Sequence, residues 1–337
     1  MTSLALSAHQ SGRVSDALLS VQSSIKDWLA EVTTEMVHII TSDAPLLAQV
    51  GRHLITMKGK QFRPTLVLLS SAVDDTPTDR AIAMAAIVEL IHLATLVHDD
   101  AVDHSVLRRG MPTINALFSH QIAVIMGDFL YSVALTRLAK LEDLAALHVL
   151  VDASTQMTIG EMRQLSTLEP LAFSEEDYEF LIRSKTASFM SAACQVGSMC
   201  GASRHREALA RYGDALGMAF QIIDDLIDYT EATETTGKPT GLDLQEHKVT
   251  LPLIAALRTM SPAARRRVEA FFASDTPDEA GVAEMVEIVT EAGGLEYARR
   301  RGEEFASQAE AALAPLPPSV AREALLSSIT YVMERNA

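Results

Sequence analysis

Two clusters of aspartates are the residues in this sequence best suited to chemistry. Asp99 and Asp103 lie four residues apart in the segment DDAVD, and Asp224 and Asp228 have the same spacing in DDLID. Residues four apart share one face of a helix, so each pair should present two carboxylates in one direction. Carboxylates this close repel each other unless a cation lies between them. Magnesium suits such a pair, because it takes hard oxygen ligands together with phosphate oxygens of a substrate.

Both clusters follow long apolar segments and are predicted near the C-terminal ends of their helices. Negative charge is unfavourable there because of the helix dipole, so the placement favours a function over a solvated helix end. A single DDxxD motif could be a solvated helix end, whereas two are hard to attribute to chance. We therefore predict that the two clusters face each other and bind magnesium ions with a polyphosphate between them.

Basic residues beside the acidic clusters could bind the phosphate groups of such a ligand. Arginine offers a planar fork for phosphate oxygens, and lysine offers a mobile point charge. His92 lies two helical turns before Asp99 on nearly the same face, and it is a further candidate phosphate donor, whereas His98 should point elsewhere. The candidate cations are Lys60, Arg63, Arg108, Arg109, Lys185 (followed by Thr186), Lys238 and Lys248.

Composition predicts a helical protein with a large core. Apolar residues make up 48% of the chain, which excludes intrinsic disorder. Glycine, proline and aromatic residues are sparse, and sheet proteins use more of them. The formal net charge of −16 argues against binding to nucleic acid. No segment resembles a linker between domains, so we predict a flexible tail over residues 1–15 and one all-α domain over 16–337.

Hydrophobic periodicity and breakers locate the expected elements. Apolar residues recur at helical spacing between residues 15 and 50, and Pro64 suits the first turn of the next helix. A capping box at Ser174–Asp177 should begin the helix near 175. Residues 107–112 are predicted as a loop, and the polar segment 231–247 as a loop over the site that could act as a lid. Further helices are predicted at 79–104, 115–140, 142–165, 175–200 and 205–230.

The cysteines and the apolar segments bear on the compartment. Cys194 and Cys200 form neither a disulfide framework nor a zinc pattern, so they are expected in the core of a protein from a reducing compartment. The N-terminus lacks the features of a secretion signal. The most apolar stretch, 81–97, contains Glu89 and His92, which a bilayer would resist. These features predict a cytoplasmic protein without a transmembrane segment.

These motifs together resemble those of the trans-isoprenyl diphosphate synthases, also called polyprenyl synthetases. The resemblance covers about residues 20–335, and it implies a bundle of about ten or more antiparallel helices around a deep central cavity, normally in a homodimer. It also implies head-to-tail condensation of isopentenyl diphosphate with an allylic prenyl diphosphate. The matching segments are 58–64, 89–115, 127–132, 185–186, 220–229 and 237–253.

The resemblance assigns a role to each candidate residue. About three magnesium ions per site would be bound by Asp99, Asp103 and Asp224. Asp100, Asp225 and Asp228 are also counted among the metal-binding residues, in a supporting role. Contacts to the allylic substrate are implied for Arg108, Lys185, Thr186, Gln221 and Lys238. Contacts to isopentenyl diphosphate are implied for Lys60, Arg63, His92 and Arg109. Of all these residues, the ones expected to be catalytic are Asp99, Asp103, Asp224, Lys185 and Arg108.

The length of the product is expected to depend on the residues before the first cluster. In the family, bulky aromatic residues five and four positions before the first aspartate stop elongation early, and here these positions hold Ala94 and Thr95. We therefore predict a medium- or long-chain all-trans product of roughly thirty to fifty carbons. Met126 and Leu130 are candidates for the floor of the channel.

Four other functions are weighed against this one. The nearest is a geranylgeranyl diphosphate synthase, which makes a shorter product. A class I terpene cyclase would have a different second metal motif and no site for isopentenyl diphosphate. A metal-dependent phosphohydrolase would leave the second DDxxD motif unexplained. A regulatory subunit of a heteromeric synthase would usually have lost aspartates, and both motifs are intact here.

Overall fold

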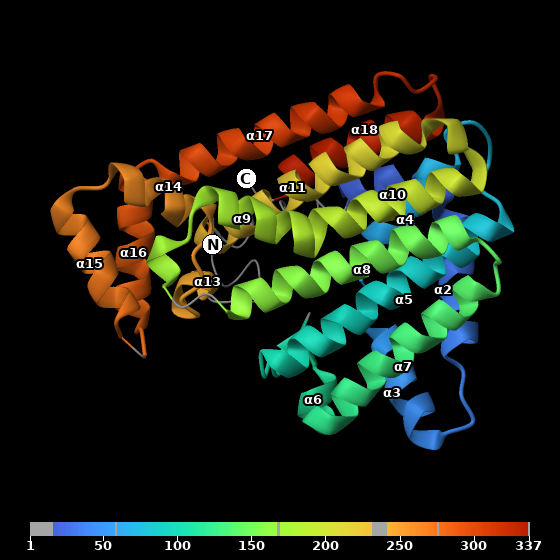
Figure 1. The fold of residues 1–337 in the computed structure, drawn as a ribbon, viewed down its shortest axis with the longest axis horizontal. Coiled ribbons are helices and arrows are strands. Elements are labelled where there is room, and N and C mark those ends of the chain that lie inside the picture. Colours follow the sequence, from blue (N-terminus) through green and yellow to red (C-terminus); the bar gives the residue numbers. More distant parts are fainter. Residues whose placement is uncertain are drawn as a thin grey trace, which may run out of the picture.

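The computed structural model describes residues 16–57, 59–108, 110–166, 169–230, 241–274 and 276–335. Within these residues the chain is almost entirely helical, which confirms the predicted all-α class (Figure 1). The first half contains a helical segment at 16–22, the 3₁₀ turn Ser23–Ile25, α2 (Lys26–Ile40), α3 (Pro45–Thr56), α4 (Phe62–Ser71), α5 (Asp79–Val102), α6 (Ile114–Leu117), α7 (His120–Ala139) and α8 (Leu144–Leu165). A small antiparallel hairpin pairs β1 (Leu107–Arg108) with β2 (Met111–Pro112), where the sequence predicted only a loop.

The second half of the chain supplies the remaining helices of the bundle. It contains α9 (Glu175–Ile182), a π-helical turn (Arg183–Ala187), α10 (Ser188–Gly201), α11 (Arg206–Thr230), α13 (Leu242–Gln245), α14 (Leu251–Thr259), α15 (Pro262–Phe272), α16 (Glu279–Glu291), α17 (Gly294–Leu313) and α18 (Val320–Met333), with short 3₁₀ turns at Pro170–Ala172 and Ser203–His205. In Figure 1, α15 and α16 form one end of the molecule, and α17 runs along α11.

The core lies between helices that are apolar on nearly every face. α4 buries all of its residues except Arg63, and most of α5 is buried. Helices that are hydrophobic all round belong in the interior of a protein. α4 packs on α5 and α10, and α10 packs in turn on α11. The two helices that carry the aspartate clusters, α5 and α11, are therefore held by the same core.

Local signals explain where most helices begin. The Thr78 hydroxyl accepts from the amide of Ala81 at the start of α5. The capping box at Ser174 and Asp177 is present as predicted, with the side chain of each residue bonded to the amide of the other. The apolar pattern between residues 15 and 50 is broken between α2 and α3, where Thr41 is extended and Pro45 begins a new helix.

The predicted helix over 175–200 contains a bulge that periodicity does not reveal. The π-helical turn Arg183–Ala187 separates α9 from α10. The prediction of a loop over 231–247 is wrong at its end, because Leu242–Gln245 form the short helix α13. Residues 231–240 and the predicted tail at 1–15 lie outside the described residues.

Two of the described helices are long and apolar enough to cross a membrane by length and composition alone. In α5, 67% of the most apolar window is buried inside the protein, as expected for a core helix. In α7, 33% of the corresponding window is buried. α7 therefore presents much of its apolar surface to the outside, whereas α5 does not.

Candidate active site

The first aspartate cluster lies at the C-terminal end of α5, as predicted. The amide of Asp103 donates to the carbonyl oxygen of Asp99 at 2.8 Å, so the last turn of the helix holds the two residues on one face. Burial raises the pKa of Asp99 to about 6. Lys185 and Arg108 oppose this rise, whereas the negative charges of Glu161 and Asp103 add to it. Without a bound cation, Asp99 is therefore an unfavourably placed carboxylate.

Asp100 points in a different direction from Asp99. Its two carboxylate oxygens accept from Nε of Arg108 at 2.8 and 2.9 Å, and Asp100 itself is buried. This pair attaches β1 to the end of α5. The structure thus places Asp100 as the partner of Arg108, and the contact of Asp100 with magnesium stays a prediction. Arg109 lies outside the described residues.

The second cluster lies on the last turns of α11, and its three aspartates have three different environments. Asp224 is partly exposed, and its Oδ1 accepts from Arg335 at 2.8 Å. Asp225 is buried. The Asp228 carboxylate accepts from the amides of Leu242 and Asp243 at 3.1 Å each, which holds the start of α13 against α11.

α13 contributes a further carboxylate to the site. Burial raises the pKa of Asp243 to about 7, with Asp228 as the next cause and Lys248 opposing. The amide of Lys248 donates to the carbonyl of Asp243 at 2.7 Å. The pKa of Lys248 is raised by Glu246, Asp243 and Asp103, which together outweigh the lowering effect of its burial. Acidic residues from both sides of the site thus stabilise the positive charge of Lys248.

The π-helical turn positions Lys185 and Thr186. Lys185 forms an ion pair with Glu161 on α8 and donates to Oε1 of Gln164 at 2.9 Å. The turn fits because glycines face it from both sides. A Cβ at Gly160 would lie 2.9 Å from Cβ of Ser184, and one at Gly217 would lie 2.5 Å from Cα of Ala187. π-helical bulges occur frequently at functional sites.

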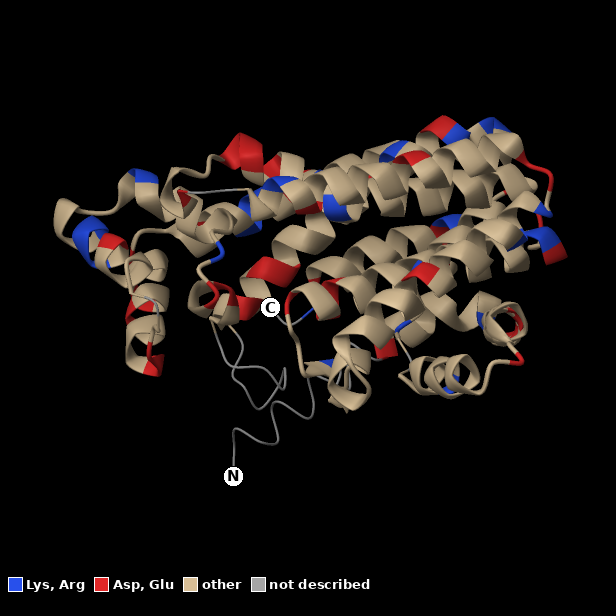
Figure 2. Cartoon of the chain, turned by 60° about the horizontal axis from the view of Figure 1, so that its bottom comes forward, with Lys and Arg blue, Asp and Glu red and all other residues tan. Residues whose placement is uncertain are grey.

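One cavity of about 520 Å³ brings these elements together. Asp103 of the first cluster and Asp225 of the second both line it, so one aspartate of each cluster faces the same pocket. The other predicted ligands Asp99 and Asp224 are not among its lining residues, and their binding of magnesium stays a prediction. Figure 2 shows acidic ribbon segments gathered near the C-terminal end of the chain. The predicted site residues in its wall are Asp103, Lys185, Thr186, Gln221 and Asp225. The wall also includes Glu161, Gln164, Tyr178, Asp243, Glu246 and Lys248.

The predicted isopentenyl diphosphate residues Lys60, Arg63 and His92 form contacts of their own. Nη1 of Arg63 donates to Nε2 of His92 at 3.0 Å. Nζ of Lys60 lies 5.9 Å from the centre of the Tyr331 ring. Phe62 stacks on Phe220 at 6.0 Å and contacts Tyr331 at 5.4 Å. These residues do not line the cavity described above.

The turn after α18 adds a cation, Arg335, that the sequence did not predict at the site. The guanidinium of Arg335 lies 4.2 Å from the centre of the Phe220 ring while it contacts Asp224. It therefore connects the aromatic group to the second aspartate cluster. Lys238, which was predicted to contact the allylic substrate, lies outside the described residues.

The predicted chain-length residues lie in the packed part of α5. Ala94 is 1% exposed, and the Thr95 hydroxyl donates to the carbonyl of His92 at 2.7 Å. Met126 and Leu130 are buried on α7, which packs against α5. None of these residues lines the cavity at the aspartate clusters.

The donor set fits magnesium bound together with a substrate. Across the described ranges, no three His, Cys, Asp or Glu side chains are grouped closely enough to hold an ion by themselves. Magnesium commonly uses one or two carboxylates, with waters and substrate phosphates completing its shell. The raised pKa values of Asp99 and Asp243 indicate carboxylates that a cation would stabilise.

The fold and the site define a class of protein, namely helical bundles in which two aspartate-rich helix ends contribute to one cavity that lysines also line. Residues 44–289 match the profile of the polyprenyl synthetase family. The chain is 36% identical to the octaprenyl diphosphate synthase of Haemophilus influenzae over 310 residues, which is 91% of this chain and 94% of that protein. This chain belongs to the polyprenyl synthetase family.

Further relatives and solved structures agree. The chain is 37% identical to an all-trans-nonaprenyl-diphosphate synthase (geranyl-diphosphate specific) of Rhodobacter capsulatus, covering 88% of this chain and 91% of that protein. A decaprenyl diphosphate synthase structure from the same organism has a TM-score of 0.88 at 35% identity, covering 94% and 98% of the two chains. A polyprenyl synthase from Caulobacter crescentus, complexed with calcium and isoprenyl diphosphate, has a TM-score of 0.89 at 33% identity, covering 95% and 98%.

Proposed function

We propose that the chain condenses isopentenyl diphosphate head-to-tail with an allylic prenyl diphosphate and makes a medium- or long-chain all-trans polyprenyl diphosphate. The observation that carries this proposal is the cavity in which Asp103, Lys185, Gln221 and Asp225 meet. Relatives named octaprenyl and nonaprenyl diphosphate synthases, matched over about nine tenths of this chain, favour a longer product than geranylgeranyl diphosphate.

The allylic diphosphate would bind between the two aspartate clusters. Asp99, Asp103 and Asp224 would hold about three magnesium ions. When bound, magnesium neutralises the negative charge that develops on the departing pyrophosphate. Lys185 would add a cation at the same group. Asp225 and Asp228 would hold the site together through their contacts with Tyr178 and α13.

The reaction needs no protein nucleophile. The C–O bond of the allylic substrate breaks, and the oxygens of Thr186 and Gln221 face the cation that results. The double bond of isopentenyl diphosphate, held by Lys60, Arg63 and His92, then forms the new C–C bond. A proton leaves the new intermediate for the released pyrophosphate. The site must exclude water, which would react with the cation.

An assay of the purified chain tests this function. Labelled isopentenyl diphosphate, magnesium and a farnesyl or geranylgeranyl primer should give products of roughly thirty to fifty carbons after dephosphorylation and chromatography. EDTA should stop the reaction, and added magnesium should restore it. Cyclised hydrocarbons would indicate a terpene cyclase, and a product of geranylgeranyl length alone would indicate the shorter synthase. Incorporation only after a second protein is added would indicate a heteromeric enzyme, a relevant outcome because a 31% identical relative is named heptaprenyl diphosphate synthase component 2.

Arg63→Ala should impair the use of isopentenyl diphosphate. The guanidinium donates to His92 at 3.0 Å, and both residues are proposed to hold isopentenyl diphosphate, so its removal should raise KM for isopentenyl diphosphate by about tenfold to a hundredfold. KM for the allylic primer should change little. Steady-state kinetics with each substrate varied in turn measures this difference, and Arg52→Ala, which changes an exposed residue of α3, is the control. An equal rise in both KM values would contradict the assignment.

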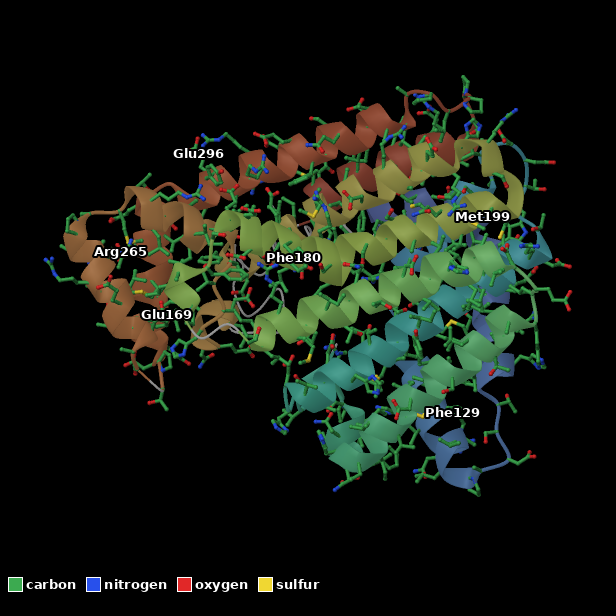
Figure 3. All side chains as sticks on the ribbon, in the orientation of Figure 1. Phe129, Glu169, Phe180, Met199, Arg265 and Glu296 are labelled. Carbon is green, nitrogen blue, oxygen red and sulfur yellow. The ribbon has the colours of Figure 1, made fainter. Side chains whose placement is uncertain are left out.

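We also propose a cytoplasmic homodimer in which α7 and α8 are covered by a second copy. Exposed apolar side chains lie on these helices and on α6, namely Leu117, Val124, Ile125, Leu144, Ile159, Met162 and Leu165. A bilayer is a poor cover for this surface, because Asp128 is largely exposed in the middle of α7. Figure 3 labels Phe129 on α7, one of the helices that carry this surface. Sedimentation velocity should give twice the mass of the chain, and a monomer at micromolar concentration would contradict the dimer.

The unpaired cysteines support the proposed location. Cys194 is buried and Cys200 is partly buried, and both are free. Burial raises the pKa of the Cys194 thiol to about 12, so its reactive thiolate form is scarce. Free structural cysteines of this kind are typical of proteins from a reducing compartment.

A further inference from the structure

A buried tyrosine outside both aspartate motifs is bonded to the second one. Tyr178 on α9 is 1% exposed, and its hydroxyl donates to Oδ2 of Asp225 at 2.6 Å. The other oxygen of Asp225 accepts from Nε2 of Gln221 at 2.9 Å, one turn earlier on α11. Asp225 is 7% exposed. Its two oxygens are thus held by two donors from two different helices.

This arrangement determines how the amide of Gln221 is turned. A carboxylate only accepts hydrogen bonds, so Gln221 must direct its NH₂ group toward Asp225 and its carbonyl oxygen away. That oxygen accepts from the hydroxyl of Thr186 at 2.9 Å. The Thr186 hydroxyl has a single hydrogen, and this hydrogen is used in the bond. Its lone pairs remain available on the side of the cavity, which Thr186 and Gln221 both line.

We propose that Tyr178 is a positioning residue for the ionisation step, acting through Asp225 and Gln221 on the Thr186 hydroxyl. The proposal rests on the proposed function, because it concerns the stabilisation of the allylic cation. In a prealigned site, the negative end of the Thr186 dipole faces the position where positive charge develops, so no reorganisation is needed during the reaction. Without the Tyr178 hydroxyl, Asp225 is free to rotate and the amide of Gln221 loses its fixed direction.

Tyr178→Phe tests the first link of this chain. With a preloaded allylic primer, the single-turnover rate should fall about tenfold, which corresponds to about 1.4 kcal/mol of transition-state stabilisation. KM for isopentenyl diphosphate should stay within about twofold, because the contacts of Arg63 with His92 and of Lys60 with the Tyr331 ring are separate from the hydrogen bonds of Tyr178, Asp225, Gln221 and Thr186. The matched control is Tyr212→Phe, which removes an equally buried hydroxyl that donates to the carbonyl of Leu325 at 2.8 Å. The control should lower the free energy of unfolding and leave the rate unchanged.

A double-mutant cycle tests the route to Thr186. If Tyr178 acts through Thr186, then Tyr178→Phe should cost little rate in a Thr186→Val background, and the two losses should not add. Asp225→Asn breaks the same chain by a different change, since its amide cannot accept from both donors. Its loss of rate should not add to that of Thr186→Val if the chain carries the effect, whereas a loss caused by weaker magnesium binding should add and should shrink at high magnesium. This variant also serves if Tyr178→Phe does not fold.

The outcomes separate the proposal from the function on which it rests. A wild-type rate in folded Tyr178→Phe, or losses that add fully with Thr186→Val, would overturn the positioning role. An inactive wild-type chain in the presence of magnesium and both substrates would instead overturn the proposed function.

Discussion

Asp99→Asn is expected to abolish prenyl transfer and at the same time to stabilise the metal-free protein. Asp99 is predicted to hold magnesium, and its loss should lower turnover by about 10³-fold or more. In the absence of metal, burial and the nearby charges of Glu161 and Asp103 make the ionised form unfavourable. Asparagine has nearly the same shape and no charge. The free energy of unfolding at pH 7 should therefore rise by on the order of 1–2 kcal/mol, after allowance for solvent screening.

The pH dependence of the free energy of unfolding tests the direction of this stabilisation independently. A carboxyl whose pKa is about 6 in the folded protein and about 3.8 when unfolded keeps its proton longer in the folded state. The metal-free wild type should thus lose stability as the pH rises from about 4 through 6, and the variant should lose less. Asp243, with a pKa of about 7, should extend the loss to higher pH in both proteins.

Urea unfolding between pH 4 and 8, without metal and then with magnesium and pyrophosphate, measures both effects. Magnesium with pyrophosphate should stabilise the wild type strongly and the variant weakly. Asp79→Asn is the control, because Asp79 is an exposed acid at the other end of α5. An active Asp99→Asn enzyme would show that Asp99 is not a magnesium ligand. A variant as unstable as the wild type at pH 7 would show that the Asp99 charge does not destabilise the metal-free protein.

The parts of the site that the sequence predicts well are those within one helix. The i, i+4 spacing places Asp99 with Asp103, and the structure holds them on the last turn of α5. The capping box at Ser174 and the long apolar helix α5 are equally local signals. Each depends on residues within a few positions of one another, so periodicity and side-chain chemistry are enough to find them.

The parts that the sequence could not predict depend on residues far apart in the chain. Tyr178 meets Asp225 across 47 positions, and Arg335 meets Asp224 across 111. Neither contact leaves a local pattern, because each is created by the packing of α9 and α18 against α11. The π-helical turn could not be predicted from periodicity, because a helical pattern continues on both sides of it. Two local features of the sequence could nevertheless have indicated further site residues. One is the acidic residue Asp243 in the segment GLDLQEHK. The other is the i, i+3 pair of Glu161 and Gln164 on α8, whose side chains both contact Lys185.

Ala94→Tyr is expected to shorten the product. Ala94 is 1% exposed on α5, the helix that carries Asp99, and α5 packs against α7. The growing chain is proposed to run along α5 away from the aspartate clusters. A tyrosine ring at this position should block it, and the main product should lose at least about one isoprene unit. Reverse-phase chromatography of the dephosphorylated products gives the chain length directly.

A graded series distinguishes a blocked channel from a damaged core. Overpacking a buried position usually costs about 1–3 kcal/mol of stability, so Ala94→Tyr needs variants of smaller volume beside it. If the side chain meets the product, the chain length should fall steadily from Ala94→Ser through Ala94→Leu to Ala94→Tyr, while incorporation of the first isopentenyl unit stays near the wild-type rate. If the core is damaged instead, the rate of every step should fall together and the distribution of lengths should stay the same. An unchanged product spectrum in folded Ala94→Leu and Ala94→Tyr would remove Ala94 from the channel and leave Met126 and Leu130 on α7 as the next positions to substitute.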